Sequence, residues 1–302
     1  MKKKVLITGG TGFVGRSLTQ LLVENGYEVS VLSRSKRENK PSISYCIWDI
    51  DKQIIDEQAV LEADYIIHLA GENIAGKQWT SQRKKAIIDS RVQPVQLIGS
   101  ILKKRNKKLE AFISASGVGV YGAVNGSEIC DETIKLADDF LGHTCQKWED
   151  TADSLSPFSN RIVKVRTGLV LGKNEGFLKK MLPVFKWRLG AVLGSGKQYM
   201  PWIHIDDLCG IYLEAITNSE MDGAYNAAIN DNTTNMFFSI TLAKVLGYKI
   251  WLPNVPSFIL QLAMGEMSQI ILKGRRVSSD KIENLGFHFQ FKDLSLALRQ
   301  CI

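Results

Sequence analysis

Short apolar runs alternate with longer amphipathic stretches through the first half of the chain. The runs "KVLITG" (4–9), "YEVSVLSR" (27–34), "ADYIIHLAG" (63–71) and "LEAFISASG" (109–117) are rich in apolar residues. Such runs are typical of parallel strands that are buried on both faces. Because they alternate with helical segments, the pattern predicts an α/β fold with a doubly wound parallel sheet. A further strand is predicted over 160–172.

The last third of the chain has a different pattern. Residues 176–216 predict a helix, a glycine-rich loop, a strand and a second helix that begins near Asp206. Helical segments then follow one another without the earlier alternation, at 235–248, 257–274 and 278–287.

This change of pattern suggests a division of the chain. We expect a dinucleotide-binding domain at 1–172, with a return to it at about 200–228. A smaller, mostly helical lobe on the substrate side would comprise 173–199 and 229–302.

A glycine-rich loop joins the first predicted strand to the first predicted helix. Gly9 would permit a tight turn, Gly12 would let the backbone approach a pyrophosphate, and Gly15 would let the helix pack close to the strand. The N-terminus of a helix also offers unpaired N–H groups and a partial positive charge to phosphates. In this context the loop predicts a dinucleotide site.

The end of the second predicted strand bears on which dinucleotide is bound. An NAD site usually has an acidic residue there, which holds the ribose 2′-hydroxyl. Here the strand ends in Ser33 and Arg34, and the next acid is Glu38. A hydroxyl and a guanidinium suit a 2′-phosphate, so the sequence favours NADP over NAD. The alternative is that Arg34 is an ordinary surface arginine.

Arg91 lies on an apolar helical face. Ile87, Val95, Ile98 and Leu102 share this face within 84–104. A charged residue among apolar ones needs a partner, which a cofactor phosphate or ribose could supply. The alternative is that Arg91 extends to the edge of the helix and reaches water.

Composition excludes several classes of protein. The chain has 302 residues, 45% of them hydrophobic, and lacks an apolar run long enough for a membrane span or a signal peptide. We therefore expect a cytoplasmic protein. Five scattered cysteines without a C-x-x-C pair and four dispersed histidines indicate neither disulfides nor a metal site.

The net charge of +7 comes partly from local basic clusters, such as "KKRNKK" at 103–108. Nucleic acid could bind such patches. Few of the clusters have interleaved aromatic residues, so a solvated surface is the preferred interpretation. Nucleic acid is therefore not expected as a partner and is kept as a third hypothesis.

Four segments together resemble a known superfamily. They are "TGGTGFVG", "DYIIHLAGENIAGKQW", "SASGVGVYG" and "PWIHIDDL". They resemble the short-chain dehydrogenase/reductase superfamily, in particular an atypical branch of its extended class, the NAD-dependent epimerase/dehydratase-like family. Residues 262–289 resemble that branch's own C-terminal segment. The resemblance implies a Rossmann fold.

The resemblance also assigns cofactor contacts. It implies that Gly9, Thr11, Gly12, Phe13, Val14 and Gly15 form the pyrophosphate loop, and that Ser33 and Arg34 hold the adenosine phosphate. Asp49 would lie near the adenine. Leu69, Ala70 and Gly71 would line the ribose and nicotinamide side, Arg91 would contact the cofactor, and Cys145 would border the nicotinamide.

The usual catalytic pair of the superfamily is absent. Its enzymes use Tyr-x-x-x-Lys with a nearby Ser or Thr, and the tyrosinate moves the proton that accompanies hydride transfer. Using Glu149 as the common anchor, the Tyr position is Leu141 and the Lys position is Cys145. The catalytic residues are therefore unknown from the sequence.

Substitutes for the pair can be named. His143 and Lys147 have the same spacing in a shifted register, although a His and a Lys are also common on the exposed face of a helix. Ser116 and Tyr121 close the predicted strand that ends in "VYG". These four are the catalytic candidates.

The segment "PWIHIDDL" and the loop before it belong to the predicted substrate side. His204 could point into the cleft or into the core, and both alternatives stay open. Trp202 and "LGSGKQYM" (193–200) are candidates for the pocket lining. Asp206, at a helix start, is expected to be a cap rather than a catalyst.

The sequence thus predicts an NADP-binding oxidoreductase or epimerase. Its substrate would be a hydroxyl or carbonyl compound, sugar-nucleotide-like or another small molecule. The alternative is a non-catalytic NADP-binding module that senses redox state. Superfamily members often dimerise through two helices, so a homodimer stays open.

Overall fold

The computed structural model of the chain describes residues 2–126, 128–173 and 175–302. Its main sheet has eight strands in the order β11-β8-β6-β5-β1-β2-β3-β4. Every pairing in it is parallel except the one between β4 and β3. In chain order, its strands are β1 (Lys4–Thr8), β2 (Glu28–Ser33), β3 (Ile43–Asp49), β4 (Ile54–Ile55), β5 (Tyr65–His68), β6 (Ala111–Gly117), β8 (Ile162–Thr167) and β11 (Gly223–Ala227).

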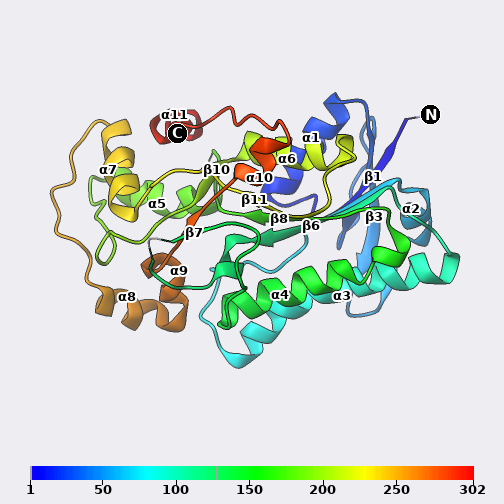
Figure 1. Cartoon of the computed structure of the whole chain (residues 1–302), viewed down its shortest axis with the longest axis horizontal. Coiled ribbons are helices and arrows are strands. Elements are labelled where there is room, and N and C mark those ends of the chain that lie inside the picture. Colours follow the sequence, from blue (N-terminus) through cyan, green and yellow to red (C-terminus); the bar gives the residue numbers. More distant parts are fainter. Residues whose placement is uncertain (1, 127, 174) are drawn as a thin grey trace.

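Helices cover both faces of this sheet (Figure 1). One face carries α3 and α4, and α1, α6, α10 and α11 lie on the other. This confirms the predicted doubly wound parallel sheet. In chain order, the helices are α1 (Phe13–Glu24), α2 (Glu57–Glu62), α3 (Ser81–Arg105), α4 (Phe140–Asp153), α5 (Gly176–Lys186), α6 (Ile205–Thr217), α7 (Asn235–Val245), α8 (Ser257–Met264), α9 (Gln269–Leu272), α10 (Asp280–Asn284) and α11 (Leu294–Cys301).

The two faces of the sheet form two hydrophobic clusters. Leu6 and Ile66 pack with Ile98 of α3 on one face. Their neighbours along the strands, Ile7 and Ile67, point to the opposite face and pack with helix α1. The alternation follows from the strand period of two residues, and burial on both sides explains why the strands read as continuous apolar runs.

The strand predicted over 160–172 is in fact two strands. β8 stays in the main sheet, whereas β9 (Leu169–Leu171) pairs in parallel with β10 (Trp202–His204) in a separate small sheet. The break falls at Gly168, where a Cβ atom would lie 2.6 Å from the carbonyl oxygen of Pro201. The chain turns there because its backbone passes directly against another segment.

The C-terminal segment is joined to the rest of the molecule in two ways. Strand β12 (Arg276–Val277) pairs in parallel with β7 (Ile129–Cys130). Phe238 of α7 and Leu298 of α11 belong to the same hydrophobic cluster as Ile7 of β1. The lobe predicted at 229–302 therefore shares its core with the sheet, and the proposed domain boundaries stay a prediction.

Candidate cofactor and substrate site

The glycine loop lies at the carboxyl end of β1, next to the point where the strand order reverses between β1 and β5. Gly9 has a φ of 69°, and a Cβ atom there would lie 2.8 Å from the backbone of Leu69 and Ala70. A Cβ atom at Gly15 would lie 2.3 Å from the carbonyl oxygen of Gly9. Helix α1 can therefore begin directly against the loop, with its first N–H groups free for a phosphate.

A buried chain of hydrogen bonds fixes the strand next to the loop. The backbone N–H of Ala70 donates to Thr8 Oγ1 at 3.1 Å, and this hydroxyl lies 2.7 Å from Nδ1 of His68. Nε2 of His68 lies 3.1 Å from the carbonyl oxygen of Arg91, which can only accept. Nε2 therefore carries the proton and Nδ1 accepts from Thr8. Burial lowers the pKa of His68 to about 3, so the imidazole is neutral.

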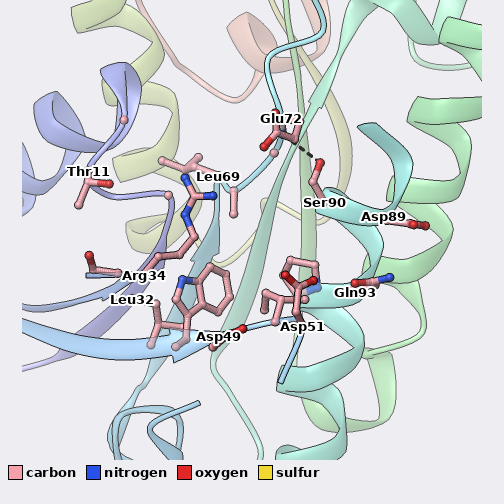
Figure 2. Close-up of a pocket in the computed structure, with 18 of the residues that line it drawn as sticks. Thr11, Leu32, Arg34, Asp49, Asp51, Leu69, Glu72, Asp89, Ser90 and Gln93 are labelled. Atoms are coloured by element: carbon pink, nitrogen blue, oxygen red, sulfur yellow. Dashed lines mark hydrogen bonds between the residues drawn. The ribbon is translucent and has the colours of Figure 1, made fainter. Parts of the chain in front are cut away.

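A first cavity of about 700 Å³ opens beside the glycine loop (Figure 2). It brings together many of the residues predicted to contact the cofactor, from the ends of β1, β2, β3 and β5. Those lining it are Gly9, Thr11, Gly12, Ser33, Arg34, Asp49, Leu69, Ala70 and Gly71. The opposite wall is formed by α3, with Asp89, Ser90 and Gln93.

Two residues of the predicted set, Phe13 and Val14 at the start of α1, point away from this cavity. Phe13 packs against Gly172 and Gly176, and Val14 packs against the hydrophobic core. Their side chains do not line the first cavity. Phe13, Val14 and Gly15 could contribute only backbone N–H groups to a pyrophosphate.

The charges around the first cavity are unevenly paired. Three of its acids have a cation of their own: Asp49 pairs with Lys52, Glu72 with Arg83, and Asp89 with Lys85. Arg34 is exposed and lies at the end of β2, across the cavity from α3. Figure 2 shows its side chain extending toward Leu69.

Arg34 forms no ion pair within the residues that the structure describes. Its guanidinium is thus available to an anionic ligand. The hydroxyl of Ser33 is less available, because it donates to the carbonyl oxygen of Ser35 at 2.8 Å.

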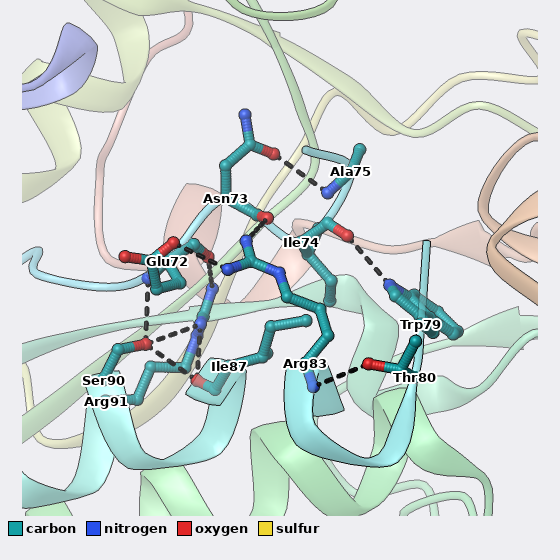
Figure 3. A network of polar contacts seen from close by, with 10 residues as sticks. All are labelled: Glu72, Asn73, Ile74, Ala75, Trp79, Thr80, Arg83, Ile87, Ser90 and Arg91. Carbon is teal, nitrogen blue, oxygen red and sulfur yellow. Dashed lines mark hydrogen bonds and ion pairs between the residues drawn. The ribbon is translucent and has the colours of Figure 1, made fainter. Parts of the chain in front are cut away.

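The loop that follows β5 is held by two arginines of α3 (Figure 3). Arg83 donates to the Glu72 carboxylate at 2.9 Å and to the carbonyl oxygen of Asn73 at 2.6 Å. Arg91 donates to the carbonyl oxygens of Ile87 at 2.8 Å and Glu72 at 3.1 Å. Arg91 thus has protein partners of its own, and burial lowers its pKa.

A second cavity of about 550 Å³ adjoins the first across this loop. Its walls come from the loop after β5, from β6, α4 and α5, and from residues 193–201 and 264–277. Arg91 of α3 also lines this cavity, with its guanidinium 4.9 Å from the centre of the Trp148 ring. The second cavity occupies the predicted substrate side.

Leu141 and Cys145 both line the second cavity. The sequence predicts that they stand at the superfamily's Tyr and Lys positions, and neither side chain is a phenol or an ammonium. Burial raises the pKa of Cys145 to about 12, which keeps its sulfur protonated and makes it a poor proton relay.

Ser116 and Tyr121 are committed to a buried polar network. Ser116 Oγ donates to Glu149 Oε1 at 2.6 Å. Tyr121 Oη donates to Asn226 Oδ1 at 2.7 Å and accepts from Arg166 at 3.1 Å. Burial raises the pKa of Tyr121 to about 12. Ser116 borders the second cavity, but Tyr121 does not line it.

His143 and Lys147 lie on the exposed face of α4. The side chain of His143 is 54% exposed and its Nε2 lies 2.6 Å from Asp138. The two residues are not part of the second cavity. The structure does not bring this pair toward a substrate.

Three expectations for "PWIHIDDL" need correction or completion. Trp202 does not line the pocket: it is fully buried, and its Nε1 donates to Asp231 at 2.9 Å. His204 lies in the core, 3.9 Å from the ring centre of Phe291. Asp206 is not the helix cap, because Nδ1 of His204 accepts from the backbone N–H of Asp206. In contrast, Gln198, Tyr199 and Met200 of the preceding loop do line the second cavity.

Sequence reasoning missed the buried pair of Glu149 and Arg166. Arg166 Nη2 lies 2.8 Å from Glu149 Oε2, and Arg166 Nε lies 2.9 Å from Glu149 Oε1. The available signal was a charged residue inside the apolar run 162–171, since a buried charge requires a partner.

Neither a metal cluster nor a membrane-spanning helix occurs in the described part of the chain. Ranges 2–126, 128–173 and 175–302 contain no group of three or more His, Cys, Asp or Glu side chains that could hold a metal ion. None of the helices in these ranges has both the length and the apolar character that crossing a membrane requires.

Comparison with known proteins identifies the family. Residues 5–228 match the model of the NAD dependent epimerase/dehydratase family. The chain belongs to this family. Residues 255–301 match a second model, a domain of unknown function (DUF1731).

Relatives in this epimerase/dehydratase family match the chain over nearly its whole length. The epimerase family protein YfhF of Bacillus subtilis is 34% identical over 99% of this chain and 97% of that protein. The human epimerase family protein SDR39U1 is 33% identical over 99% of both chains. These names describe family membership and not a defined reaction.

Solved structures agree with the fold. Human SDR39U1 (isoform 2), solved with NADPH, has a TM-score of 0.86 at 32% identity, over 99% of this chain and 98% of that one. UDP-glucose 4-epimerase of Thermotoga maritima has a TM-score of 0.78 at 17% identity, over 99% of this chain and 97% of that one. The second likeness supports only the fold.

Proposed function

We propose that the protein binds NADP in the first cavity and uses it to oxidise or reduce a hydroxyl or carbonyl carbon of a small substrate. The observation that carries the proposal is the position of Arg34. It follows directly after β2, where NAD-binding folds place an acid, and it faces the cavity without an ion-pair partner among the described residues. The NADPH bound to human SDR39U1 supports the same assignment.

In this proposal each part of the first cavity has one task. The N-terminus of α1 and the backbone from Gly9 to Gly15 would hold the pyrophosphate. Arg34 would hold the 2′-phosphate, and Asp49 would lie near the adenine. Leu69 to Gly71 would face the ribose and nicotinamide side. The cofactor, when bound, would accept or donate a hydride.

The accompanying proton needs a carrier from the second cavity. Tyr199 is a phenol on that wall, and its hydroxyl makes no hydrogen bond with the part of the chain that the structure describes. We assign the proton transfer to Tyr199, in place of the missing tyrosine of α4. A Tyr199→Phe variant should keep its affinity for NADP and lose turnover by roughly two to four orders of magnitude.

Calorimetric titration with NADP and NAD tests the cofactor assignment. We expect NADP to bind at least about tenfold tighter, equivalent to about 1.4 kcal/mol, and Arg34→Ala to lose most of this preference. Arg37→Ala is the matched control, because Arg37 is an exposed neighbour outside the cavity lining. Equal binding of the two dinucleotides, or no binding, would refute the proposal.

The residues that α4 contributes to the second cavity favour a second candidate function, a non-catalytic NADP-binding sensor. Leu141 and Cys145 replace the catalytic pair, and the hydroxyls of Ser116 and Tyr121 already have partners. A non-catalytic NADP-binding sensor would have the same features. NADPH oxidation with a panel of carbonyl compounds separates the two functions, since the sensor predicts tight binding without turnover.

A further inference from the structure

Three of the four side-chain hydroxyls among the described residues that line the second cavity already donate hydrogen bonds within the protein, and that of Tyr199 is the exception. Ser116 donates to a buried carboxylate at 2.6 Å, and Thr144 and Thr167 donate to backbone carbonyl oxygens at 2.7 and 3.2 Å. Gln198 donates both amide hydrogens to backbone carbonyl oxygens, at 2.9 and 2.8 Å, whereas its Oε1 accepts no hydrogen bond from the described residues. Each buried hydroxyl of a ligand left without a partner costs about 1–3 kcal/mol. These engaged hydroxyls favour a ligand with few hydroxyl groups of its own.

Apolar side chains make up much of the remaining wall. They come from separate elements, including Phe177 of α5, Met200 of the loop before β10, and Met264 at the end of α8. Methionine fills irregular space and adapts to the shape of a ligand. The body of a fitting ligand is apolar.

The charged side chains that line this cavity all have the same sign. They are Arg91, Lys180, Lys273 and Arg275, and no Asp or Glu is among the described lining residues. Arg275 lies 3.8 Å from Glu128, a side chain that is itself 68% exposed, and Lys180 donates to a carbonyl oxygen. A cleft with charges of one sign and apolar walls concentrates ligands of the opposite sign.

Two of these cations come from the C-terminal segment of unknown function. Lys273 and Arg275 lie between α9 and β12, and Gly274 between them passes directly against Tyr199. A Cβ atom at Gly274 would lie 2.0 Å from the carbonyl oxygen of Tyr199. Gln198 adds a hydrogen bond to the carbonyl oxygen of Ile271 at 2.8 Å. The backbone that carries both cations is thus fixed before a ligand binds.

We propose that the second cavity takes a small anion with an apolar carbon skeleton, a carboxylate or a phosphate monoester, and that residues 255–301 supply its anion site through Lys273 and Arg275. The inference rests on the proposed function, since the hydroxyl or carbonyl to be converted would belong to this ligand. It gives the C-terminal segment a specific task, which is to recognise the charged end of the substrate.

Titration calorimetry on the protein loaded with NADP tests this assignment. The probes are phenylpyruvate (an apolar carboxylate), phenyl phosphate (an apolar phosphate ester), phenylacetone (a neutral ketone) and UDP-glucose (a sugar nucleotide). We expect one of the two apolar anions to bind at least about tenfold tighter than phenylacetone and UDP-glucose. Which anion binds distinguishes a carboxylate from a phosphate substrate.

Variants then locate the anion site. Lys273→Ala and Arg275→Ala should each weaken the anion at least about fivefold and leave NADP binding unchanged. Lys179→Ala is the control, as an exposed lysine of α5 outside the cavity lining. Lys273 is exposed, so its variant should fold, and the melting temperature checks this.

Three results would overturn the inference: tighter binding of UDP-glucose, equal binding of phenylacetone, or a loss of NADP affinity in place of anion affinity. If NADP fails to bind while the anion binds unaided, the proposed function is wrong and the anion site stands. If NADP binds and neither anion does, the anion site is wrong and the proposed NADP binding stands.

Discussion

Arg166 of β8 and Glu149 of α4 form a buried ion pair behind the second cavity, with two N–O distances of 2.8 and 2.9 Å. Their side chains are 5% and 6% exposed. Ser116 also donates a hydrogen bond to Glu149, and Tyr121 accepts one from Arg166. Two catalytic candidates named from the sequence are thus parts of one structural network.

Breaking this pair on one side should be costly. We expect Glu149→Leu to lower the free energy of unfolding by about 3–5 kcal/mol, because Arg166 would remain buried without a counterion. The double variant Glu149→Leu/Arg166→Met should be considerably less destabilised. Urea unfolding measures both. Asp153→Ala, which removes a partly exposed partner of Lys164, should cost at most about 1 kcal/mol. Similar losses in single and double variants would contradict the pairing.

Tyr121→Phe removes a hydroxyl that makes two buried hydrogen bonds. The variant should lose about 1–3 kcal/mol of unfolding free energy, since Asn226 and Arg166 each lose a partner. NADP affinity should stay unchanged, and so should turnover of any substrate found. A loss of turnover by two or more orders of magnitude with unchanged stability would make Tyr121 the proton donor.

The fold could be predicted because its main sheet is buried on both faces. Continuous apolar runs such as 63–71 are typical of strands in that environment, and Gly9 to Gly15 signal the turn into α1. The split at Gly168 could not be predicted, because the approach of Pro201 that requires it comes from a segment far away in sequence. Strands β7 and β12 have two residues each, too few for any periodicity.

The site could be predicted only where the functional residues lie within one short segment of the sequence. The end of β2 is an example, since Arg34 follows the strand directly. The cations Lys180 and Lys273 lie far apart in the sequence and meet only through the folded backbone. Likewise, the sequence left His204 open between cleft and core and wrongly predicted Trp202 in the pocket lining, because their partners Phe291 and Asp231 come from distant segments.

Gly15→Ala should damage the glycine loop. The added Cβ atom would lie 2.3 Å from the carbonyl oxygen of Gly9, so α1 must move away from β1. We expect a loss of about 1–3 kcal/mol in unfolding free energy, together with a loss of NADP binding. Gly126→Ala is the control, because a Cβ atom there would meet no described atom within 4 Å outside its chain neighbours. Normal NADP binding by Gly15→Ala would show that the loop tolerates the displacement.

The cofactor preference should be reversible at the end of β2. In Ser33→Asp/Arg34→Ala, a carboxylate would replace the hydroxyl and the guanidinium that line the first cavity and that we propose to face the ribose 2′ position. We expect NAD to bind at least about tenfold tighter than NADP in this variant, measured by calorimetry. Persistent preference for NADP would mean that another group recognises the 2′-phosphate.

His68 should make the stability of the protein depend on pH. Its pKa is about 3 in the folded protein, compared with 6.5 for a free histidine, because the ring is fully buried between Thr8 and the backbone of Arg91. Between these two values the unfolded chain binds a proton that the folded protein does not. The free energy of unfolding therefore rises with pH in this window, by up to about 1.4 kcal/mol per pH unit, and this contribution is constant above it.

Urea unfolding at several pH values between about 4 and 7 measures this dependence. His68→Asn removes the titrating group, so its curve should be flatter than that of the parent protein, whatever its absolute stability. Burial also lowers the pKa of His204, which acts in the same direction and remains in the variant. His204→Asn should therefore flatten the curve separately. Parallel curves for the parent and His68→Asn would mean that His68 is protonated in the folded state, and that Nδ1 does not accept from Thr8.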